Sequence, residues 1–208
     1  TTEIYTLSLH DALPISKQWT VGLIHSLQKR EDSAKAEDFR PVTVMSMYYR
    51  VYTGIRAGQI LAQLAQWSDF MQCGFMRKRQ ASDVWYFVSV CLEVSCQTDT
   101  PVHGLVADLV KAYNTLPRDP TTTFLRILGV PPWFLRMWNS HLTEFTRYFV
   151  VRRSTSPAVT SCTGYPEGCP LACAAMTAVD VVWHTWQQVH TPRVLPLSYV
   201  DNFELICD

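Results

Sequence analysis

Two aspartates stand at the ends of apolar, strand-like runs that lie far apart in the sequence. Asp108 ends the run from Val102, and Asp201 follows the run from Leu195 to Val200. A carboxylate inside a buried run costs several kcal/mol unless it is paired or binds a cation. Two such residues, each ending a strand, predict a shared metal site on one sheet. Hard oxygen ligands suit Mg²⁺, with Mn²⁺ as a substitute, and a pair of such ions carries out phosphoryl transfer.

The residues around both aspartates resemble the palm motifs of reverse transcriptases. Residues 108–113, Asp-Leu-Val-Lys-Ala-Tyr, resemble the first motif, in which Asp is followed closely by Lys-Ala and an aromatic residue. Residues 164–171 resemble the second motif, normally Gly-x-Pro-Gln-Gly-x-x-Leu-Ser. Residues 199–202, Tyr-Val-Asp-Asn, resemble the third motif, normally Tyr-x-Asp-Asp. Each block alone is weak, whereas the ordered set is a strong indication.

Two blocks upstream extend the resemblance. Residues 39–43, Phe-Arg-Pro-Val-Thr, resemble the Arg-Pro-Ile segment of the fingers, and residues 72–79 resemble the Gln-x-Gly-Phe block that precedes the palm. Together the five blocks cover residues 17–208 in the family's order. The non-LTR retrotransposon type is the most similar subgroup, with group II intron enzymes as relatives.

The resemblance implies an RNA-directed DNA polymerase that uses two Mg²⁺ ions. One ion activates a primer 3′-hydroxyl and the other stabilises the leaving pyrophosphate. The implied partners are an RNA template, a DNA primer and deoxynucleoside triphosphates. Asp108 and Asp201 are the implied catalytic residues, and Asn202 joins them as a metal ligand. The implied nucleotide-binding residues are Tyr113, Arg77, Arg79 and Gly168, and the implied template-binding residues are Gln72, Gly74, Pro166 and Glu167. Gln72 and Gly74 are expected to shape the template-side turn rather than to touch substrate.

Three residues depart from the family's pattern. Glu167 replaces the usual Gln of the second motif, which puts a negative charge near template and nucleotide. Asn114 stands where many relatives carry Asp. Asn202 replaces the second Asp of the third motif, so one charge that would neutralise Mg²⁺ is lost. Tyr113 has an ordinary alternative role as a core aromatic.

Two other functions fit part of this pattern. A degenerate, non-catalytic RNA-binding module related to reverse transcriptases would keep the basic groups of the fingers while losing metal ligands, as Asn202 and Glu167 suggest. A metal-dependent phosphodiesterase would use the two aspartates alone. The second alternative is weaker, because the Lys-Ala-Tyr and Pro-Glu-Gly blocks would then be coincidences.

Composition is that of a globular protein with one sizeable core or two small subdomains: 208 residues, 48% hydrophobic and 12% aromatic. Lys plus Arg equals Asp plus Glu at 18 each, which counts mildly against a nucleic-acid enzyme, because phosphate contacts favour positive charge. Local basic clusters occur in expected loops, and each is equally well explained as solvated surface. These clusters are Lys29-Arg30, Arg77-Lys78-Arg79 and Arg152-Arg153.

The cysteines and the apolar runs restrict the cellular setting. Seven cysteines, an odd number, favour a reducing intracellular compartment over a disulfide framework, and the family is compatible with the nucleus. Cys162, Cys169 and Cys173 lack the Cys-x-x-Cys pair or nearby His that a zinc site needs. No apolar run approaches the ~20 residues that span a bilayer, so no membrane partner is expected. The sequence leaves the oligomeric state undefined.

We expect an α+β fold: a polymerase palm, with an antiparallel sheet and helices on one face, joined to fingers of helices and strands. Residues 6–15 resemble a translated sequencing-library adapter, so residues 1–16 are expected to be a non-native leader. The expected subdomains are the fingers at 17–101 and a partial palm at 102–208. Because this palm ends after the third motif and no thumb follows, we expect a fragment that is inactive alone.

Hydrophobic periodicity and turn residues predict the individual elements. The last of them is a tight hairpin over residues 197–206, with Asp201 and Asn202 at the turn because Asn tolerates positive φ. The other expected elements are a strand at 18–28, a loop at 31–38, helices at 43–66, 82–96, 119–128, 133–142 and 171–188, and a strand at 146–151 followed by a turn at 152–157.

Overall fold

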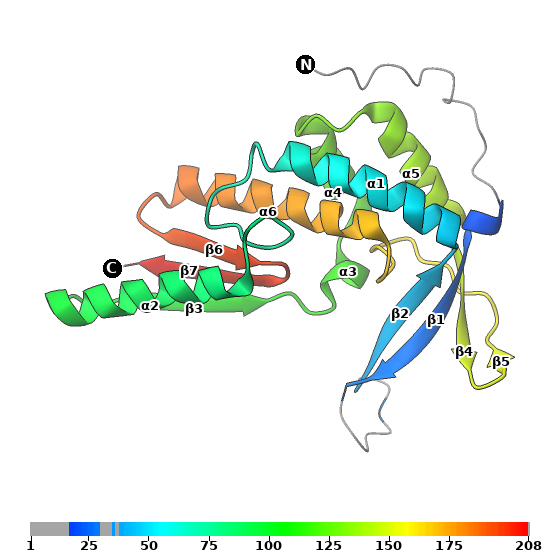
Figure 1. Ribbon diagram of the computed structural model, residues 1–208, viewed down its shortest axis with the longest axis horizontal. Coiled ribbons are helices and arrows are strands. Elements are labelled where there is room, and N and C mark those ends of the chain that lie inside the picture. Colours follow the sequence, from blue (N-terminus) through cyan, green and yellow to red (C-terminus); the bar gives the residue numbers. More distant parts are fainter. Residues whose placement is uncertain (1–16, 30–34, 36–37, 208) are drawn as a thin grey trace.

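The computed structural model describes residues 17–29, 35 and 38–207, and one long helix lies at its centre (Figure 1). The expected leader at 1–16 lies outside the described residues, as does most of the expected loop at 31–38. No helix in the described part of the chain combines the length and apolarity needed to cross a membrane.

The central helix is α6 (Pro170–His190), and small residues allow other helices to approach it closely. Its buried face includes Ala174, Ala175 and Ala178. Helices α1 (Met47–Leu64) and α4 (Arg118–Ile127) pack against it, and α5 (Pro132–Glu144) adds Trp138 to the same core. Both α5 and α6 begin with proline, which lacks the N–H that a helix leaves unpaired there.

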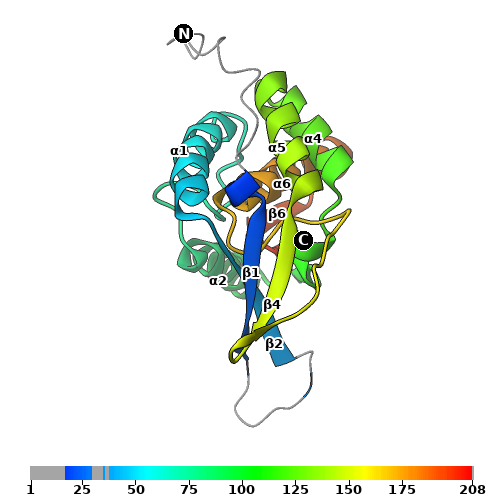
Figure 2. The ribbon, with the colours of Figure 1, turned by 90° about the vertical axis from the view of Figure 1, so that its right-hand side faces the viewer.

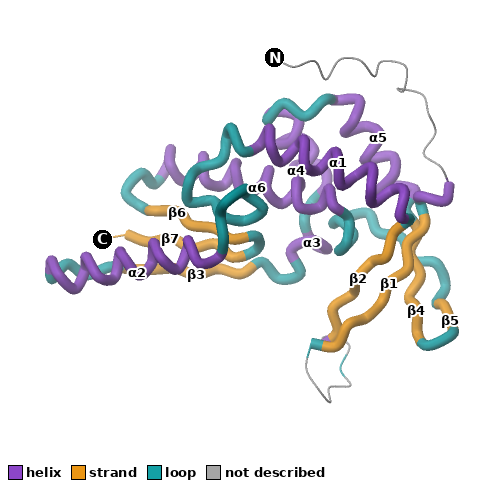
Figure 3. The backbone as a smooth tube through the Cα atoms, in the orientation of Figure 1, coloured by secondary structure: helices purple, strands orange, loops and turns teal. Residues whose placement is uncertain are grey.

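Below α6 lies a three-stranded antiparallel sheet in the order β3-β7-β6 (Figure 3). Its strands are β3 (His103–Asp108), β7 (Asn202–Cys207) and β6 (Leu195–Tyr199). Helix α2 (Ala81–Thr98) contacts β6, and a small second core forms there from Met71, Cys73, Val84 and Leu197. The short helix α3 (Ala112–Thr115) follows β3.

A second sheet projects from the helices in the order β2-β1-β4-β5 (Figure 2). A 3₁₀ turn, η2 (Lys17–Trp19), precedes β1 (Val21–Gln28), which pairs antiparallel with β2 (Phe39–Met45) and parallel with β4 (Thr146–Val151). Strand β5 (Ser154–Thr155) closes the hairpin with β4. The expected fingers and palm therefore contribute strands to one sheet, while the boundary at residue 101 stays a prediction.

The mixed α+β architecture is confirmed, but the helix expected at 43–66 is wrong at its start. Residues 43–45 belong to β2, and the helix begins at Met47. The β-branched residues Val42, Thr43 and Val44 suit a strand, and pairing with β1 supplies the long-range partner that local periodicity cannot reveal. The other four expected helices and the strand at 146–151 are confirmed within a few residues at each end.

The burial expected around Asp108 is also wrong. Strand β3 is exposed along its whole length, with Leu105 60% and Val106 71% exposed. The strand lies at the edge of the sheet, where β7 is its only paired neighbour among the described strands. Desolvation therefore does not force Asp108 to bind a cation, and the case for a metal site has to come from its neighbours.

His141 is a buried titratable group in the main core. Its ring stacks on Tyr49 with centroids 4.2 Å apart and lies 5.2 Å from the ring of Phe145. Neither ring nitrogen has a hydrogen-bond partner. Burial therefore lowers the pKa of His141 from 6.5 to about 4, because a charged imidazolium would lose its solvation.

This depressed pKa predicts a pH-dependent stability. The stabilisation is present above pH 6.5 and is lost as the pH falls toward 4, by about 3 kcal/mol in total. His141→Phe should keep the ring packing and remove this part of the acid sensitivity. The measurement is urea denaturation of the parent and the variant between pH 7 and 4. Parallel profiles for the two proteins would contradict the prediction.

Candidate active site

The ends of β3 and β7 bring the predicted metal ligands together. In the β3–β7 register Asp108 lies opposite Asn202, which places their Cα atoms about 4.5–5.5 Å apart. Asp201 is the residue before Asn202, and its carbonyl accepts a 3.0 Å hydrogen bond from the amide of Leu109. Asp108 and Asn202 are exposed and Asp201 is half-buried. Three oxygen-bearing side chains thus share one solvent-facing end of the sheet.

Two carboxylates, those of Asp108 and Asp201, lie at this end of the sheet in the part of the chain that the structure describes. The side-chain nitrogen Nδ2 of Asn202 donates a long 3.4 Å hydrogen bond to Asp201 Oδ1. The side-chain oxygen of Asn202 can therefore face away from that carboxylate. Among the residues that the structure describes, no three His, Cys, Asp or Glu side chains gather as a metal cluster. The donor set of two carboxylates and one amide oxygen still fits Mg²⁺ or Mn²⁺, which complete their shells with water and phosphate oxygens.

The turn that carries Asp201 differs from the expected one. Strand β7 already begins at Asn202, so the turn is Val200-Asp201, and the positive φ of 60° falls on Val200 rather than on Asn202. This backbone region is strained for a β-branched residue and suggests a conformation that the surroundings impose. Gly74 is part of those surroundings, since a Cβ on it would lie 2.4 Å from the Val200 amide nitrogen.

A buried polar network lies behind this turn and supports β6. Ser198 Oγ donates to Asp180 Oδ2 at 2.9 Å and lies 2.8 Å from His184 Nε2. The single hydroxyl proton of Ser198 is already used, so His184 donates to it. Burial raises the pKa of Asp180 to about 7 and lowers that of His184 to about 4. Ser198 is fully buried, which suits a structural support and not a nucleophile.

Gln72 belongs to the same support. It is 0% exposed and its Nε2 donates to the carbonyl of Thr177 at 3.3 Å. The neighbouring backbone pairs with β6 through Ser198 N–H to Met71 O (3.2 Å) and Cys73 N–H to Ser198 O (2.9 Å). A fully buried amide is placed to shape the neighbouring turn rather than to touch a ligand, and the template-side role of Gln72 stays a prediction. Gln72 and Gly74 brace the strand and the turn that carry Asp201.

Tyr113 lies close to Asp201. It is half-buried in α3 against the main core, and burial, with Cys173 and Asp201 nearby, raises the pKa of its hydroxyl. The phenol is therefore neutral and can offer a ring face or a hydroxyl beside the site. The packing against the core agrees with the alternative role as a core aromatic as well, so the contact with nucleotide stays a prediction.

The two predicted nucleotide-binding arginines differ in their surroundings. Arg77 is exposed. Arg79 is half-buried and donates to the carbonyls of Asp69 and Gln72, the latter at 2.7 Å, and to Ser68 Oγ at 3.2 Å. Those bonds hold the loop that precedes α2. Arg77 is the freer of the two to meet a phosphate, and a role for either stays a prediction.

Pro166, Glu167 and Gly168 form a loop between the two sheets. Pro166 is buried, Glu167 half-buried and Gly168 exposed. Asn114 Nδ2 donates to Glu167 Oε1 at 2.6 Å, and the amide of Thr43 in β2 donates to the Glu167 carbonyl at 2.8 Å. The loop thus joins β2 to α3 close to Tyr113, and its contact with template stays a prediction.

Sequence reasoning missed the Asp180–Ser198–His184 network. One available signal was the spacing of Asp180 and His184 on one face of an otherwise apolar helix, four residues apart. Burial of two titratable groups on that face requires a polar partner, which Ser198 supplies from β6.

Comparison with known proteins identifies a matching family model and several solved structures with a similar fold. Residues 27–208 match the family model described as reverse transcriptase (RNA-dependent DNA polymerase). No curated protein sequence matches the chain. Similar solved structures include telomerases from two Candida species. Apo telomerase from Candida tropicalis, truncated from its C-terminal domain, is 15% identical with a TM-score of 0.64, over 93% of this chain and 45% of that one.

Two further structures are telomerases in complex with a TWJ fragment of telomeric RNA. The one from Candida tropicalis is 14% identical, with a TM-score of 0.66, over 94% of this chain and 37% of that one. The one from Candida albicans is 12% identical, with a TM-score of 0.65, over 94% and 38%. At such identities the likeness concerns the fold alone. The chain spans less than half the length of these telomerases.

Proposed function

Because this chain belongs to the reverse transcriptase (RNA-dependent DNA polymerase) family, we propose that its site transfers deoxynucleotides to a primer 3′-hydroxyl under the direction of an RNA template. The observation that carries the proposal is the β3–β7 register, which sets Asp108 opposite Asn202 and beside Asp201 at one end of the sheet. These are the residue types and the location that a divalent metal requires.

In the proposed reaction Asp108 and Asp201 would hold two Mg²⁺ ions with help from the amide oxygen of Asn202. Bound there, such ions would supply Lewis-acid activation of the primer hydroxyl and charge stabilisation for the leaving pyrophosphate. The protein's own contribution is to fix the carboxylates: the Val200-Asp201 turn rests on Gly74, and β6 is tied to α6 through Ser198. The exposed position of Asp108 and Asn202 leaves room for primer and triphosphate.

We further propose that the chain is of the non-LTR retrotransposon type, on the strength of its five ordered sequence blocks. Telomerase structures that contain telomeric RNA support an RNA partner, since they share the fold. The proposed reaction also requires a DNA primer and deoxynucleoside triphosphates as partners. A nuclear or other intracellular location is part of the same proposal.

The metal site can be tested without catalysis. The full chain should bind Mn²⁺, and Asp108→Asn or Asp201→Asn should each weaken binding by roughly tenfold or more, because each removes a charge from the ligand set. Electron paramagnetic resonance of free Mn²⁺ during a titration measures this directly. Asp119→Asn is the matched control, since Asp119 is an exposed residue of α4 outside the site. Site variants that bind Mn²⁺ as the parent does would refute the assignment of ligands.

A further inference from the structure

We propose that Glu167 is a positioning residue, paired with Asn114, that locks the loop at residues 164–168 between α3 and β2. The two side chains come from residues 53 positions apart, and Asn114 Nδ2 donates to Glu167 Oε1 at 2.6 Å. The acceptor is a carboxylate and the bond is short, so it belongs to the stronger, charge-assisted class. The carboxylate of Glu167 is therefore directed toward α3.

On the α3 side the backbone reinforces this pair. The amide of Gly164 donates to Leu116 O at 3.0 Å, and that of Tyr165 donates to Tyr113 O at 2.6 Å. Gly164 has a φ of +70°, and a Cβ there would lie 2.2 Å from the Asn114 carbonyl oxygen. Only glycine fits this close approach, so the backbone of the loop directly contacts the backbone around Asn114.

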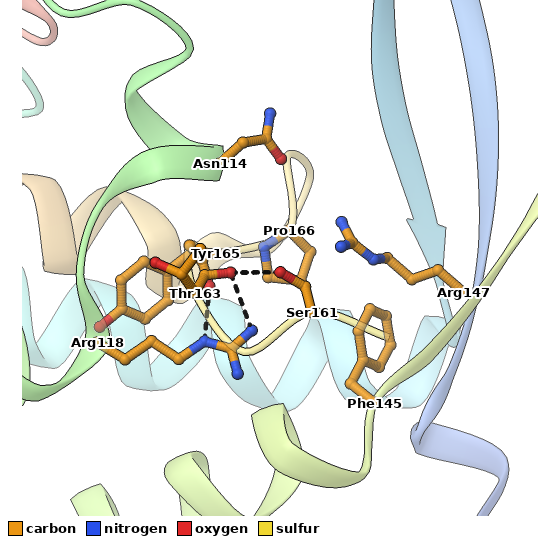
Figure 4. Close-up of a pocket in the computed structure, with 9 residues that line it drawn as sticks. Asn114, Arg118, Phe145, Arg147, Ser161, Thr163, Tyr165 and Pro166 are labelled. Atoms are coloured by element: carbon orange, nitrogen blue, oxygen red, sulfur yellow. Dashed lines mark hydrogen bonds between the residues drawn. The ribbon is translucent and has the colours of Figure 1, made fainter. Parts of the chain in front are cut away.

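On the other sides β2 and Arg118 hold the loop. The amide of Thr43 donates to the Glu167 carbonyl at 2.8 Å, and Gly168 lies against the Thr43 carbonyl. Arg118 donates to Gly164 O at 2.8 Å and to Thr163 O at 3.3 Å (Figure 4). The Asn114–Glu167 bond is thus the side-chain link in a connection that runs from β2 through the loop to the helix of Tyr113.

The chemistry of the pair allows its two roles to be exchanged. Asn114 supplies the amide donor and Glu167 the carboxylate acceptor. Asp at 114 and Gln at 167 would again give one amide donor and one carboxylate acceptor, with the roles reversed. Asn114→Asp alone would bring two carboxylates within hydrogen-bond distance of each other, and they would repel. Asn114→Asp with Glu167→Gln would restore the bond, with Gln as the donor and Asp as the acceptor.

A double-mutant cycle on the full chain tests this coupling through unfolding in urea at pH 7. Asn114→Asp should lower the folding equilibrium constant about 10- to 100-fold, and Glu167→Gln should lower it by less. The double variant should recover to within about threefold of the parent. The deficit of Asn114→Asp should shrink as the pH falls toward 4, because protonation of one carboxyl relieves the repulsion.

The matched control combines Asn114→Asp with Glu93→Gln, which has the same net charge. Glu93 lies on α2, where it accepts a hydrogen bond from Gln97, so no recovery is expected. If Asn114→Asp cannot fold but the double variant does, the recovery itself supports the pair. The proposal would be overturned if the losses in stability of the two single variants simply add in the double variant. It would also be overturned if the double variant fails to fold while Glu167→Gln folds. Unfolding reports the pair without catalysis, so this test can fail while the proposed function holds, and the reverse.

Discussion

Replacing Asp201 by alanine is expected to lower templated DNA synthesis by roughly a thousandfold or more, and Asp108→Ala should do the same. Asp108 ends β3 and Asp201 lies in the turn before β7, where its carbonyl accepts a hydrogen bond from the amide of Leu109, the residue after Asp108. Each supplies a charge on which metal binding depends, and metals supply several kcal/mol of transition-state stabilisation.

The measurement is single-turnover primer extension on an RNA template by this chain joined to the palm remainder and thumb of a related reverse transcriptase. Those parts are added because this chain spans less than half of the similar telomerases, and a thumb holds the primer–template duplex. Asp119→Ala has the same change of charge on exposed α4 and should leave the rate unchanged. Retention of the parent rate by either site variant would exclude that residue as a metal ligand.

Asn202→Asp is expected to raise the extension rate of the same joined chain by tens- to a hundredfold. Asn202 faces Asp108 across the β3–β7 register, so the new carboxylate would bring a third negative charge to the metals. The price is repulsion among the carboxylates when no metal is bound, so the variant should be less stable in EDTA and should saturate at a lower Mg²⁺ concentration.

A titration of extension rate against Mg²⁺, with Asn139→Asp as a matched change outside the site, measures this effect. Asn139 lies on α5 and hydrogen-bonds Thr122, away from the sheet end. An unchanged or lower rate for Asn202→Asp at every Mg²⁺ concentration would show that Asn202 does not weaken a metal site.

The elements that the sequence predicted best are those whose signals are local. Helix α6 is almost continuously small and apolar, and the hairpin at 195–207 has alternating residues around a short turn. The proximity of Asp108 and Asp201 was also predictable, because both end strands in recognisable motifs. Local sequence patterns predict these elements because the signal for each helix or strand comes from residues that are neighbours in the sequence.

The rest depends on partners that are distant in the sequence. The sequence predicts helix for Thr43–Met45, the last three residues of β2, because only pairing with β1 separates them from α1. Strand β3 is apolar yet exposed, since periodicity reports which residues could be buried and not what covers them. The positive φ of Val200 depends on Gly74 beneath it, from a segment more than a hundred residues earlier.

The polar contacts between elements could not be predicted from the sequence either. Asp180 and Ser198 lie on α6 and β6, and Asn114 and Glu167 on α3 and the loop before α6. A sequence shows that each residue is unusual at its position but does not show that the two members of a pair meet.

The central claim is that Asp108 and Asp201 hold metal ions for nucleotide addition to a primer. The most direct measurement is incorporation of a single deoxynucleotide by the joined chain on an RNA template, with and without Mg²⁺. We predict that the nucleotide complementary to the template is added in Mg²⁺ and that none is added in EDTA. Failure to add any nucleotide, in the parent and in Asn202→Asp alike, while the same chain binds RNA without metal, would contradict the claim and favour a non-catalytic RNA-binding module.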